Sequence, residues 1–266
     1  MDLQLSGKRA LVTGSSSGIG EAIAKLLAAE GARVIVQGRR EAEVDRVRRE
    51  IEQAGGGAHG AVGDVSLAAE AAAVAETALT ALGGIDILVN NAGAAPLGGW
   101  FDASPELWRD LYEQNVGSVV RMVQHLVPGM RECGWGRVIN LGSIVADSPR
   151  GPNPHYSATK AANVNQTVSL AKVLAGTGIT VNSVSPGLIR TPATEPWMLG
   201  WAKQHNWGDD LDVIERNVAT HIVPNPSGRM GYPSDIAYAV AFLASPLASF
   251  VNGANIRVDG GGNPTI

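Results

Sequence analysis

The feature that most constrains the fold is a short apolar run joined to a helix by a glycine-rich turn. Residues 10–13, Ala-Leu-Val-Thr, suit a buried strand, and Gly14-Ser-Ser-Ser-Gly18-Ile-Gly20 follows at once. A helical pattern then runs from Glu21 to Glu30. Glycines let the backbone approach a pyrophosphate, and a helix N-terminus offers free N–H groups and a partial positive charge. The segment therefore predicts a dinucleotide-binding loop, with G-x3-G-x-G spacing as a variant of G-x-G-x-x-G; the alternative is a tight turn without a ligand.

Strand and helix patterns alternate along the rest of the chain. Further strands are expected at 32–37, 58–62, 85–89, 137–141, 179–184 and 255–258. Further helices are expected at 41–54, 67–82, 104–114, 117–132, 154–175 and 233–244. This rhythm predicts an α/β fold with a doubly wound parallel sheet (Rossmann-type) in three α/β/α layers, as a single domain over residues 1–266.

Residues 191–230 interrupt this rhythm and carry Trp197, Trp201 and Trp207, half of the six tryptophans. A long segment with no role in the sheet is often a lid over a binding site. The alternative is an amphipathic pair of helices whose tryptophans face the core or another subunit.

Composition excludes several classes of protein. A net charge of -4 over 266 residues gives no reason to expect nucleic acid or a membrane as a partner. The single Cys133 excludes an intramolecular disulfide, and the five histidines lack metal-ligand spacing, so no metal is expected. The first residues lack the apolar run of a signal peptide, and no segment approaches a membrane span, so we expect a cytoplasmic protein.

Several polar or turn residues directly follow predicted strands. They are Gly14, Asp64, Asn90, Ser143 and Pro186. The carboxyl ends of parallel strands meet at one edge of the sheet, where ligands bind in such folds. We therefore expect these residues to line one crevice.

Ser143, Tyr156 and Lys160 are the candidate catalytic group. If a helix begins near Pro154, the four-residue spacing puts the phenol and the ammonium on one face, one turn apart. An ammonium there favours the phenolate and lowers the tyrosine pKa, so the hydroxyl can exchange a proton with an alcohol or ketone. The Ser143 hydroxyl can hold the same oxygen. The alternative is an ordinary helix, because Y-x-x-x-K by itself is common.

Arg39 and Arg40 follow the second predicted strand, where NAD sites usually place an acidic residue. Two arginines near a helix N-terminus oppose its dipole, whereas a 2′-phosphate would satisfy them with charge-assisted hydrogen bonds. NADP(H) is therefore favoured over NAD(H); the alternative is a solvated pair offset by Glu41 and Glu43.

Together these motifs resemble the short-chain dehydrogenase/reductase family, in its short single-domain branch, from about Leu5 to Gly261. The matching segments, in order, are Thr13-Gly-Ser-Ser-Ser-Gly-Ile-Gly20, Asn90-Asn-Ala-Gly93, Asn115, Ser143, Tyr156-Ser-Ala-Thr-Lys160, Pro186-Gly187 and Asp259-Gly-Gly261. The resemblance implies an oxidoreductase that transfers a hydride between NAD(P)(H) and a ketone or secondary alcohol, and a homo-oligomer, either a tetramer or a dimer.

The resemblance also implies roles for single residues. Tyr156 would be the proton donor or acceptor, Ser143 would hold the substrate oxygen, and Lys160 would lower the Tyr156 pKa and bind the nicotinamide ribose. Asn115 would order a water for proton relay. The implied coenzyme-binding residues are Gly14, Ser16, Ser17, Gly18, Ile19, Gly20, Arg39, Arg40, Asp64, Val65, Asn90, Ala92, Gly93, Tyr156, Lys160, Pro186, Gly187, Ile189 and Thr191. Ser17 departs from family members that carry a basic residue before the second glycine of the loop.

The substrate is less constrained. Apolar residues at Leu97, Trp100 and 197–201 favour a bulky apolar ketone, while Lys203 and Arg190 keep an anionic group open. A 3-oxoacyl thioester or a sugar remains an alternative. An enoyl reductase of the same fold is disfavoured, because that branch usually separates Tyr and Lys more widely. A non-catalytic nucleotide-sensing scaffold is the alternative from another class.

Overall fold

A seven-stranded parallel sheet forms the centre of the computed structural model, which describes residues 2–149 and 151–264. The strand order is β3-β2-β1-β4-β5-β6-β7. The strands are β1 (Arg9–Val12), β2 (Arg33–Gly38), β3 (Gly57–Val62), β4 (Ile87–Asn90), β5 (Gly136–Leu141), β6 (Ile179–Pro186) and β7 (Asn255–Val258). The order reverses between β1 and β4, so the predicted doubly wound topology is confirmed.

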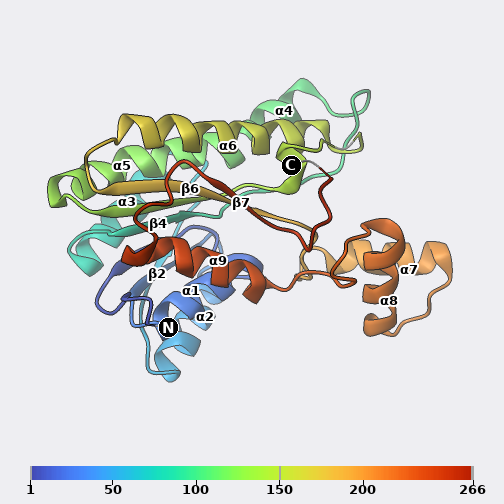
Figure 1. The fold of residues 1–266 in the computed structure, drawn as a ribbon, viewed down its shortest axis with the longest axis horizontal. Helices are drawn as coiled ribbons and strands as arrows, with labels where there is room; N and C mark the ends of the chain where they lie inside the picture. The colour runs from blue at the N-terminus through green and yellow to red at the C-terminus, as the bar shows by residue number, and fades with distance from the viewer. Residues whose placement is uncertain (1, 150, 265–266) are drawn as a thin grey trace.

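Helices cover both faces of the sheet (Figure 1). One face carries α1 (Gly18–Ala29), α2 (Glu41–Gln53) and α9 (Pro233–Ala244); the other carries α3 (Ala68–Leu82), α5 (Ser118–Cys133) and α6 (Pro154–Val173). Side chains alternate along each strand, so Val12 packs toward the first group and Leu11 toward the second. The two buried clusters that result give the expected three layers.

Asn115 lies in a π-helical turn. The chain runs from α4 (Pro105–Tyr112) through this turn, Glu113–Gly117, directly into α5 without leaving a helical path. The two helices expected at 104–114 and 117–132 are thus one helical run with a widened turn, a feature frequent at functional sites. Asn115 is fully buried there.

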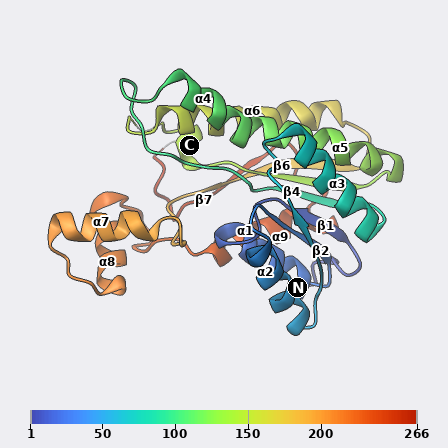
Figure 2. The same cartoon turned by 180° about the vertical axis from the view of Figure 1, so that it is seen from behind.

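Residues 195–222 form a small helical lobe beside the sheet, drawn in orange in Figures 1 and 2. It contains α7 (Glu195–His205), α8 (Leu211–Asn217) and a π-helical turn, Val218–Ile222. Its own apolar centre consists of Met198, Ala202, Ile214, Val218 and Met230, with Trp201 and Trp207 packed against it. The segment therefore contains an amphipathic pair of helices, and its role as a lid over a binding site stays a prediction.

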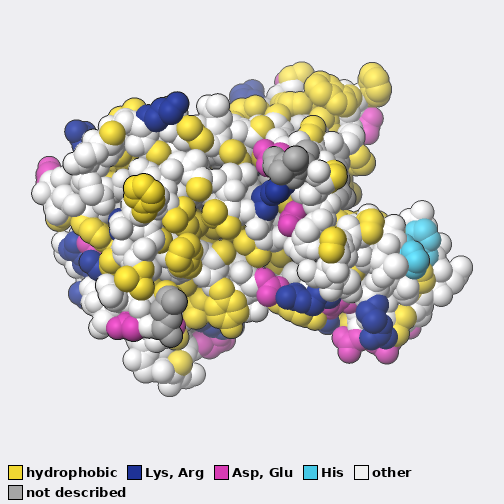
Figure 3. Space-filling view, viewed as in Figure 1, with side chains coloured by type: hydrophobic (Ala, Val, Ile, Leu, Met, Phe, Trp, Pro, Cys, Tyr) yellow, Lys and Arg dark blue, Asp and Glu magenta, His cyan; other side chains and the backbone are white. Residues whose placement is uncertain are grey.

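The lobe is separated from the body by a notch in the molecular surface, visible in Figure 3.

No helix in the ranges 2–149 and 151–264 is long and apolar enough to cross a membrane.

Candidate active site

A cavity of about 1100 Å³ lies at the carboxyl ends of the strands, between the sheet and the lobe. The predicted site residues that line it are Ile19, Gly93, Ser143, Tyr156, Lys160, Pro186, Gly187, Ile189 and Thr191. They come from segments far apart in the sequence. Of the five residues expected to share one crevice, Ser143 and Pro186 line it, whereas Gly14, Asp64 and Asn90 do not. The other predicted site residues lie outside its lining, in the glycine loop, at the ends of β2, β3 and β4, and in the π-helical turn.

Tyr156 and Lys160 lie on the first turns of α6, which begins at Pro154 as expected. The Lys160 ammonium lies 5.7 Å from the centre of the Tyr156 ring and donates a 2.7 Å hydrogen bond to the carbonyl oxygen of Leu141. Ser143 is two residues beyond the end of β5 rather than at it, and starts a short 3-10 turn. The Ser143 hydroxyl accepts a 3.4 Å hydrogen bond from the N–H of Val145, and its interaction with the Tyr156 hydroxyl lowers the tyrosine pKa.

Burial dominates the titration of this group. Burial raises the pKa of Tyr156, and the hydrogen bond with Ser143 opposes that rise without reversing it. Burial lowers the pKa of Lys160 to about 8, which leaves the ammonium mostly protonated at neutral pH. The expected net lowering of the tyrosine pKa is therefore not found, because desolvation outweighs the stabilisation of the phenolate.

Asn115 braces the loop after β4 against α6. Its amide oxygen accepts a hydrogen bond from the N–H of Ala94 at 2.8 Å, and its amide nitrogen donates to Ala94 O and to Thr159 Oγ1. Its carbonyl oxygen accepts from Asn163 at 2.9 Å. A side chain on Gly93 would come within 2.8 Å of the Asn115 amide oxygen, so this position requires glycine. Asn115 thereby joins three elements beside Lys160.

The loop between β1 and α1 has the geometry that a pyrophosphate requires. Gly14 and Gly18 adopt left-handed backbone conformations, with φ of 64° and 59°. A Cβ on Gly20 would lie 2.4 Å from the carbonyl oxygen of Gly14, so the turn closes only around a glycine. Ser17 occupies the N-cap of α1 without a side-chain hydrogen bond to the first turn. The N-terminus of α1 is therefore open to an anion, and the loop fits a dinucleotide.

Three residues that the sequence analysis missed hold this loop. Thr13 Oγ1 accepts from the N–H groups of Asn91 and Ala92, both at 3.0 Å, and Asn91 donates to the carbonyl oxygens of Thr13 and Gly14. Gln37 accepts from the N–H of Gly14 at 2.9 Å. Their position just after or within predicted strands was the available signal, but their partners depend on how the strands pair.

Arg39 and Asp64 form an ion pair at the carboxyl ends of β2 and β3. The closest atoms are 3.7 Å apart, and the arginine side chain is 72% exposed. Such a pair is held weakly, so Arg39 can turn toward another anion. Arg40 is also exposed, while Val65 is buried in the hydrophobic core behind the site.

Of the remaining predicted coenzyme-binding residues, Asn90 is buried in the sheet and Thr191 lines the cavity. Asn90 is buried in β4 and donates to Asn140, and its neighbour Asn91 reaches the cavity instead. Thr191 lines the cavity beside the glycine loop, with its methyl group 3.6 Å from the place a Cβ on Gly18 would take.

The cavity walls are mainly apolar. The apolar lining side chains include Leu97, Leu107, Leu111, Val145, Leu188, Pro196, Trp197, Trp201 and Val223, whereas Asp110, Gln114 and Asn153 add polar groups. Met198 was expected in this wall but is fully buried in the lobe. Trp100 was expected there too, but it contacts Trp108 with ring centres 5.4 Å apart and does not line the cavity. Arg190 pairs with Glu215 at 2.8 Å.

A doubly wound sheet with a glycine loop at a helix N-terminus defines a dinucleotide-binding protein, and Ser143, Tyr156 and Lys160 in the same cavity add the groups of an oxidoreductase. Residues 14–263 match a family model described as enoyl-(acyl carrier protein) reductase.

The chain is 37% identical to the 3-oxoacyl-[acyl-carrier-protein] reductase FabG of Vibrio cholerae, over 97% of this chain and 98% of that protein. It superposes on L-sorbose reductase from Gluconobacter frateurii, complexed with NADPH and L-sorbose, with a TM-score of 0.94 at 36% identity over 100% of both chains. A 7α-hydroxysteroid dehydrogenase complexed with NADH and 7-oxo glycochenodeoxycholic acid gives a TM-score of 0.87 at 34% identity, over 99% of this chain and 97% of that one.

The chain belongs to the short-chain dehydrogenase/reductase family. It is an NAD(P)-dependent oxidoreductase of alcohol and carbonyl groups.

Proposed function

We propose that the protein interconverts a bulky, largely apolar ketone and its secondary alcohol, with NADP(H) as the preferred coenzyme. The observation that carries this proposal is the juxtaposition of Ser143, Tyr156 and Lys160 in one apolar-walled cavity with Ile19 and Thr191. A carbonyl group seated beside the Tyr156 hydroxyl would lie within reach of the coenzyme-binding side of the same cavity.

The coenzyme would be held by the glycine loop, by the N-terminus of α1 and by the segment Pro186–Thr191. The open N-cap and the left-handed glycines support this assignment. When bound, NADP(H) supplies or accepts the hydride at the carbinol carbon.

Tyr156 would donate the proton to the carbonyl oxygen during reduction and accept it during oxidation. Ser143 would hold that oxygen, since it lines the same cavity as Tyr156. Lys160 would keep a positive charge beside the phenol while its hydrogen bond to Leu141 O fixes its position. Asn115 would keep the turn before α5 and the loop at Ala94 in place, and would order the relay water of the family.

The preference for NADP(H) rests on Arg39 and Arg40. Both guanidinium groups are exposed at the end of β2, and Arg39 has only a 3.7 Å pair with Asp64 to exchange for a 2′-phosphate. NADPH in the L-sorbose reductase complex agrees with this preference, and NADH in the hydroxysteroid dehydrogenase complex keeps NAD(H) as the alternative.

The preference for a bulky apolar substrate rests on the cavity walls, which include Trp197 and Trp201. The named relatives act on an acyl thioester, a sugar and a steroid, so a 3-oxoacyl thioester or a sugar remains the alternative substrate class. Enoyl reduction is less well supported, because the four-residue spacing of Tyr156 and Lys160 is that of the carbonyl-reducing branch. A nucleotide-sensing scaffold would have no need for the catalytic group.

We also propose that the protein is a homo-oligomer, a tetramer or a dimer. Tyr238 and Phe242 on α9, with Leu247 and Phe250 just beyond it, leave a row of large apolar side chains exposed.

The test is consumption of NADPH and NADH over a panel of ketones that runs from keto sugars to aryl and cyclic ketones, with Tyr156→Phe as the matched control. Wild type should turn over bulky ketones with NADPH, and the variant should lose on the order of 10²–10⁴-fold in kcat while it still binds coenzyme. Wild-type turnover by the variant would refute the role of Tyr156. Coenzyme binding without turnover of any ketone would favour the scaffold.

A further inference from the structure

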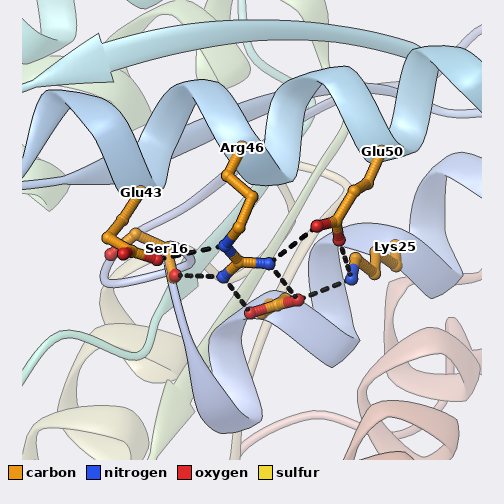
Figure 4. Close-up of polar contacts among 6 residues, drawn as sticks. Ser16, Lys25, Glu43, Arg46 and Glu50 are labelled. Carbon is orange, nitrogen blue, oxygen red and sulfur yellow. Dashed lines mark hydrogen bonds and ion pairs between the residues drawn. The ribbon is translucent and has the colours of Figure 1, made fainter.

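Arg46 on α2 connects that helix to the backbone of the coenzyme loop (Figure 4). Its Nη2 donates a 3.2 Å hydrogen bond to the carbonyl oxygen of Ser16 and a 2.9 Å bond to Glu21. Nη1 donates to Glu21 and Glu50 at 3.1 and 3.0 Å, and Nε donates to Glu43 at 3.0 Å. A guanidinium has five N–H donors, so every donor of Arg46 is used.

Lys25 completes the cluster from α1. It donates to Glu21 at 2.5 Å and to Glu50 at 2.6 Å, but it makes no hydrogen bond to the loop among the contacts of the described residues. Burial alone would raise the pKa of Glu21, but the hydrogen bonds from Arg46 and Lys25 lower it, so this carboxylate is ionised at neutral pH. Arg46 thus has two separable effects, a bond to the loop and a charge opposite Glu21.

Ser16 lies in the glycine loop next to the end of β2, where the adenosine part of the coenzyme would bind. Its hydroxyl lies so close to β2 that a Cβ on Gly38 would come within 2.6 Å of it. Gly38 is the last residue of β2 and directly precedes Arg39. A shift of the Ser16 peptide would therefore move the phosphate-binding turn relative to the end of β2.

Glu21 lies in the first turn of α1, close to the helix N-terminus that would receive the pyrophosphate. A carboxylate there competes with an anionic ligand for the same partial positive charge. Arg46 and Lys25 offset this carboxylate, so the loop can accept phosphate groups despite it.

We propose that Arg46 is a positioning residue for coenzyme binding, which fixes the Ser16 peptide so that the loop is pre-formed for the pyrophosphate. This inference rests on the proposed function, since it takes the glycine loop as the coenzyme site. Arg46 would affect binding of the pyrophosphate, which NADPH and NADH share, whereas Arg39 would pair with the 2′-phosphate, which only NADPH carries.

The experiment is titration of the coenzyme-free protein with NADPH and with NADH, followed by the change in nicotinamide fluorescence, and by steady-state kinetics at saturating coenzyme. Arg46→Gln should raise Kd for both coenzymes by a similar factor, on the order of tenfold, because one charge-assisted hydrogen bond is lost. The kcat at saturating coenzyme should stay at the wild-type value. A general loss of folded protein would lower kcat instead, so the split between Kd and kcat separates positioning from stability.

Three further variants serve as controls. Arg48 lies on the same helix and bonds Asp45 and Glu52 but not the loop, so Arg48→Gln should bind both coenzymes like wild type. Lys25→Met removes a cation from the cluster and leaves the Ser16 bond, so it should weaken binding less than Arg46→Gln. Arg46→Lys keeps the charge with three donors in place of five, and should restore only part of the affinity.

Two results would overturn the proposal. In the first, Arg46→Gln binds the coenzymes with the same Kd as Arg48→Gln. In the second, Lys25→Met raises Kd as much as Arg46→Gln does, which would mean that charge alone causes the effect. If wild type bound neither coenzyme, the proposed function itself would fail, and this inference with it. Normal binding by wild type and Arg46→Gln alike would refute the positioning role and leave the proposed function intact.

Discussion

Lys160 should be a residue that the protein keeps at a cost in stability. Lys160 is only 6% exposed, and burial lowers its pKa from 10.5 to about 8. At 1.36 kcal/mol per pH unit, this interval corresponds to about 3 kcal/mol that opposes folding while the group is charged in both states. Lys160→Met removes this penalty and also the hydrogen bond to Leu141 O, whose loss costs about 1–3 kcal/mol.

The pH dependence isolates the first of these two effects. Below pH 8, Lys160 is protonated in the folded and unfolded states, so the penalty is constant. Between pH 8 and 10.5 the folded protein loses this proton while the unfolded chain keeps it, so the stability of wild type rises with pH relative to the variant. The gain should be about 2 kcal/mol between pH 7 and pH 9.5. Tyr156 does not titrate in this window, because its pKa is raised above 10.0.

The assay is urea denaturation of the coenzyme-free wild type and Lys160→Met at several pH values from 7 to 9.5, with the free energies of unfolding subtracted at each pH. At pH 7 the variant should be as stable as wild type or more stable by up to about 2 kcal/mol, while its turnover is lost. A difference in free energy that stays constant over this range would refute the argument that Lys160 is held charged against burial.

Four other substitutions test separate parts of the molecule. Arg39→Gln should raise KM for NADPH and leave KM for NADH unchanged, because only NADPH carries the 2′-phosphate. The exposed 3.7 Å pair with Asp64 contributes little to stability, so the variant should stay folded. An equal rise in KM for both coenzymes would contradict the phosphate role. Trp197→Ala should raise KM for bulky ketones without lowering the melting temperature, whereas Met198→Ala, in the buried centre of the lobe, should destabilise it by about 2–5 kcal/mol. His155 is buried, neither ring nitrogen has a hydrogen-bond partner among the described residues, and burial lowers its pKa. His155→Leu should therefore be at least as stable as wild type in thermal melts at pH 7. As the pH drops below 6.5, His155 of the unfolded chain binds a proton before that of the folded protein does, so wild type loses stability. The variant should lack this contribution to the fall.

The sequence was sufficient for the sheet and for the chemical groups at its edge. Apolar runs followed by Gly14, Asp64, Asn90, Ser143 and Pro186 predicted where strands end, because a buried strand and a functional turn have opposite compositions. The spacing of Tyr156 and Lys160 predicted their common helix face, since helix periodicity is a local property.

Other features depended on contacts between distant segments. Asn115 was named as a site residue from the family resemblance, but no local pattern reveals its π-helical turn or its bonds to Ala94, Thr159 and Asn163. Met198 was expected to face the substrate, but it is buried in the lobe. The large apolar residues within 197–201 do not show from the sequence which of them turn toward the centre of the lobe and which toward the cavity.

The sequence by itself determined the order of the elements and the doubly wound sheet, because both follow from local periodicity and from the position of polar residues after apolar runs. The candidate catalytic group rested on the spacing of Tyr156 and Lys160 together with the resemblance to a known family. Only the tertiary structure decided the direction of the Tyr156 pKa shift, the lobe that bounds the cavity, and the contact of Arg46 with Ser16. The physical reason is that desolvation and hydrogen bonding depend on which groups meet in space, and residues 16 and 46 meet only after α2 packs beside the coenzyme loop.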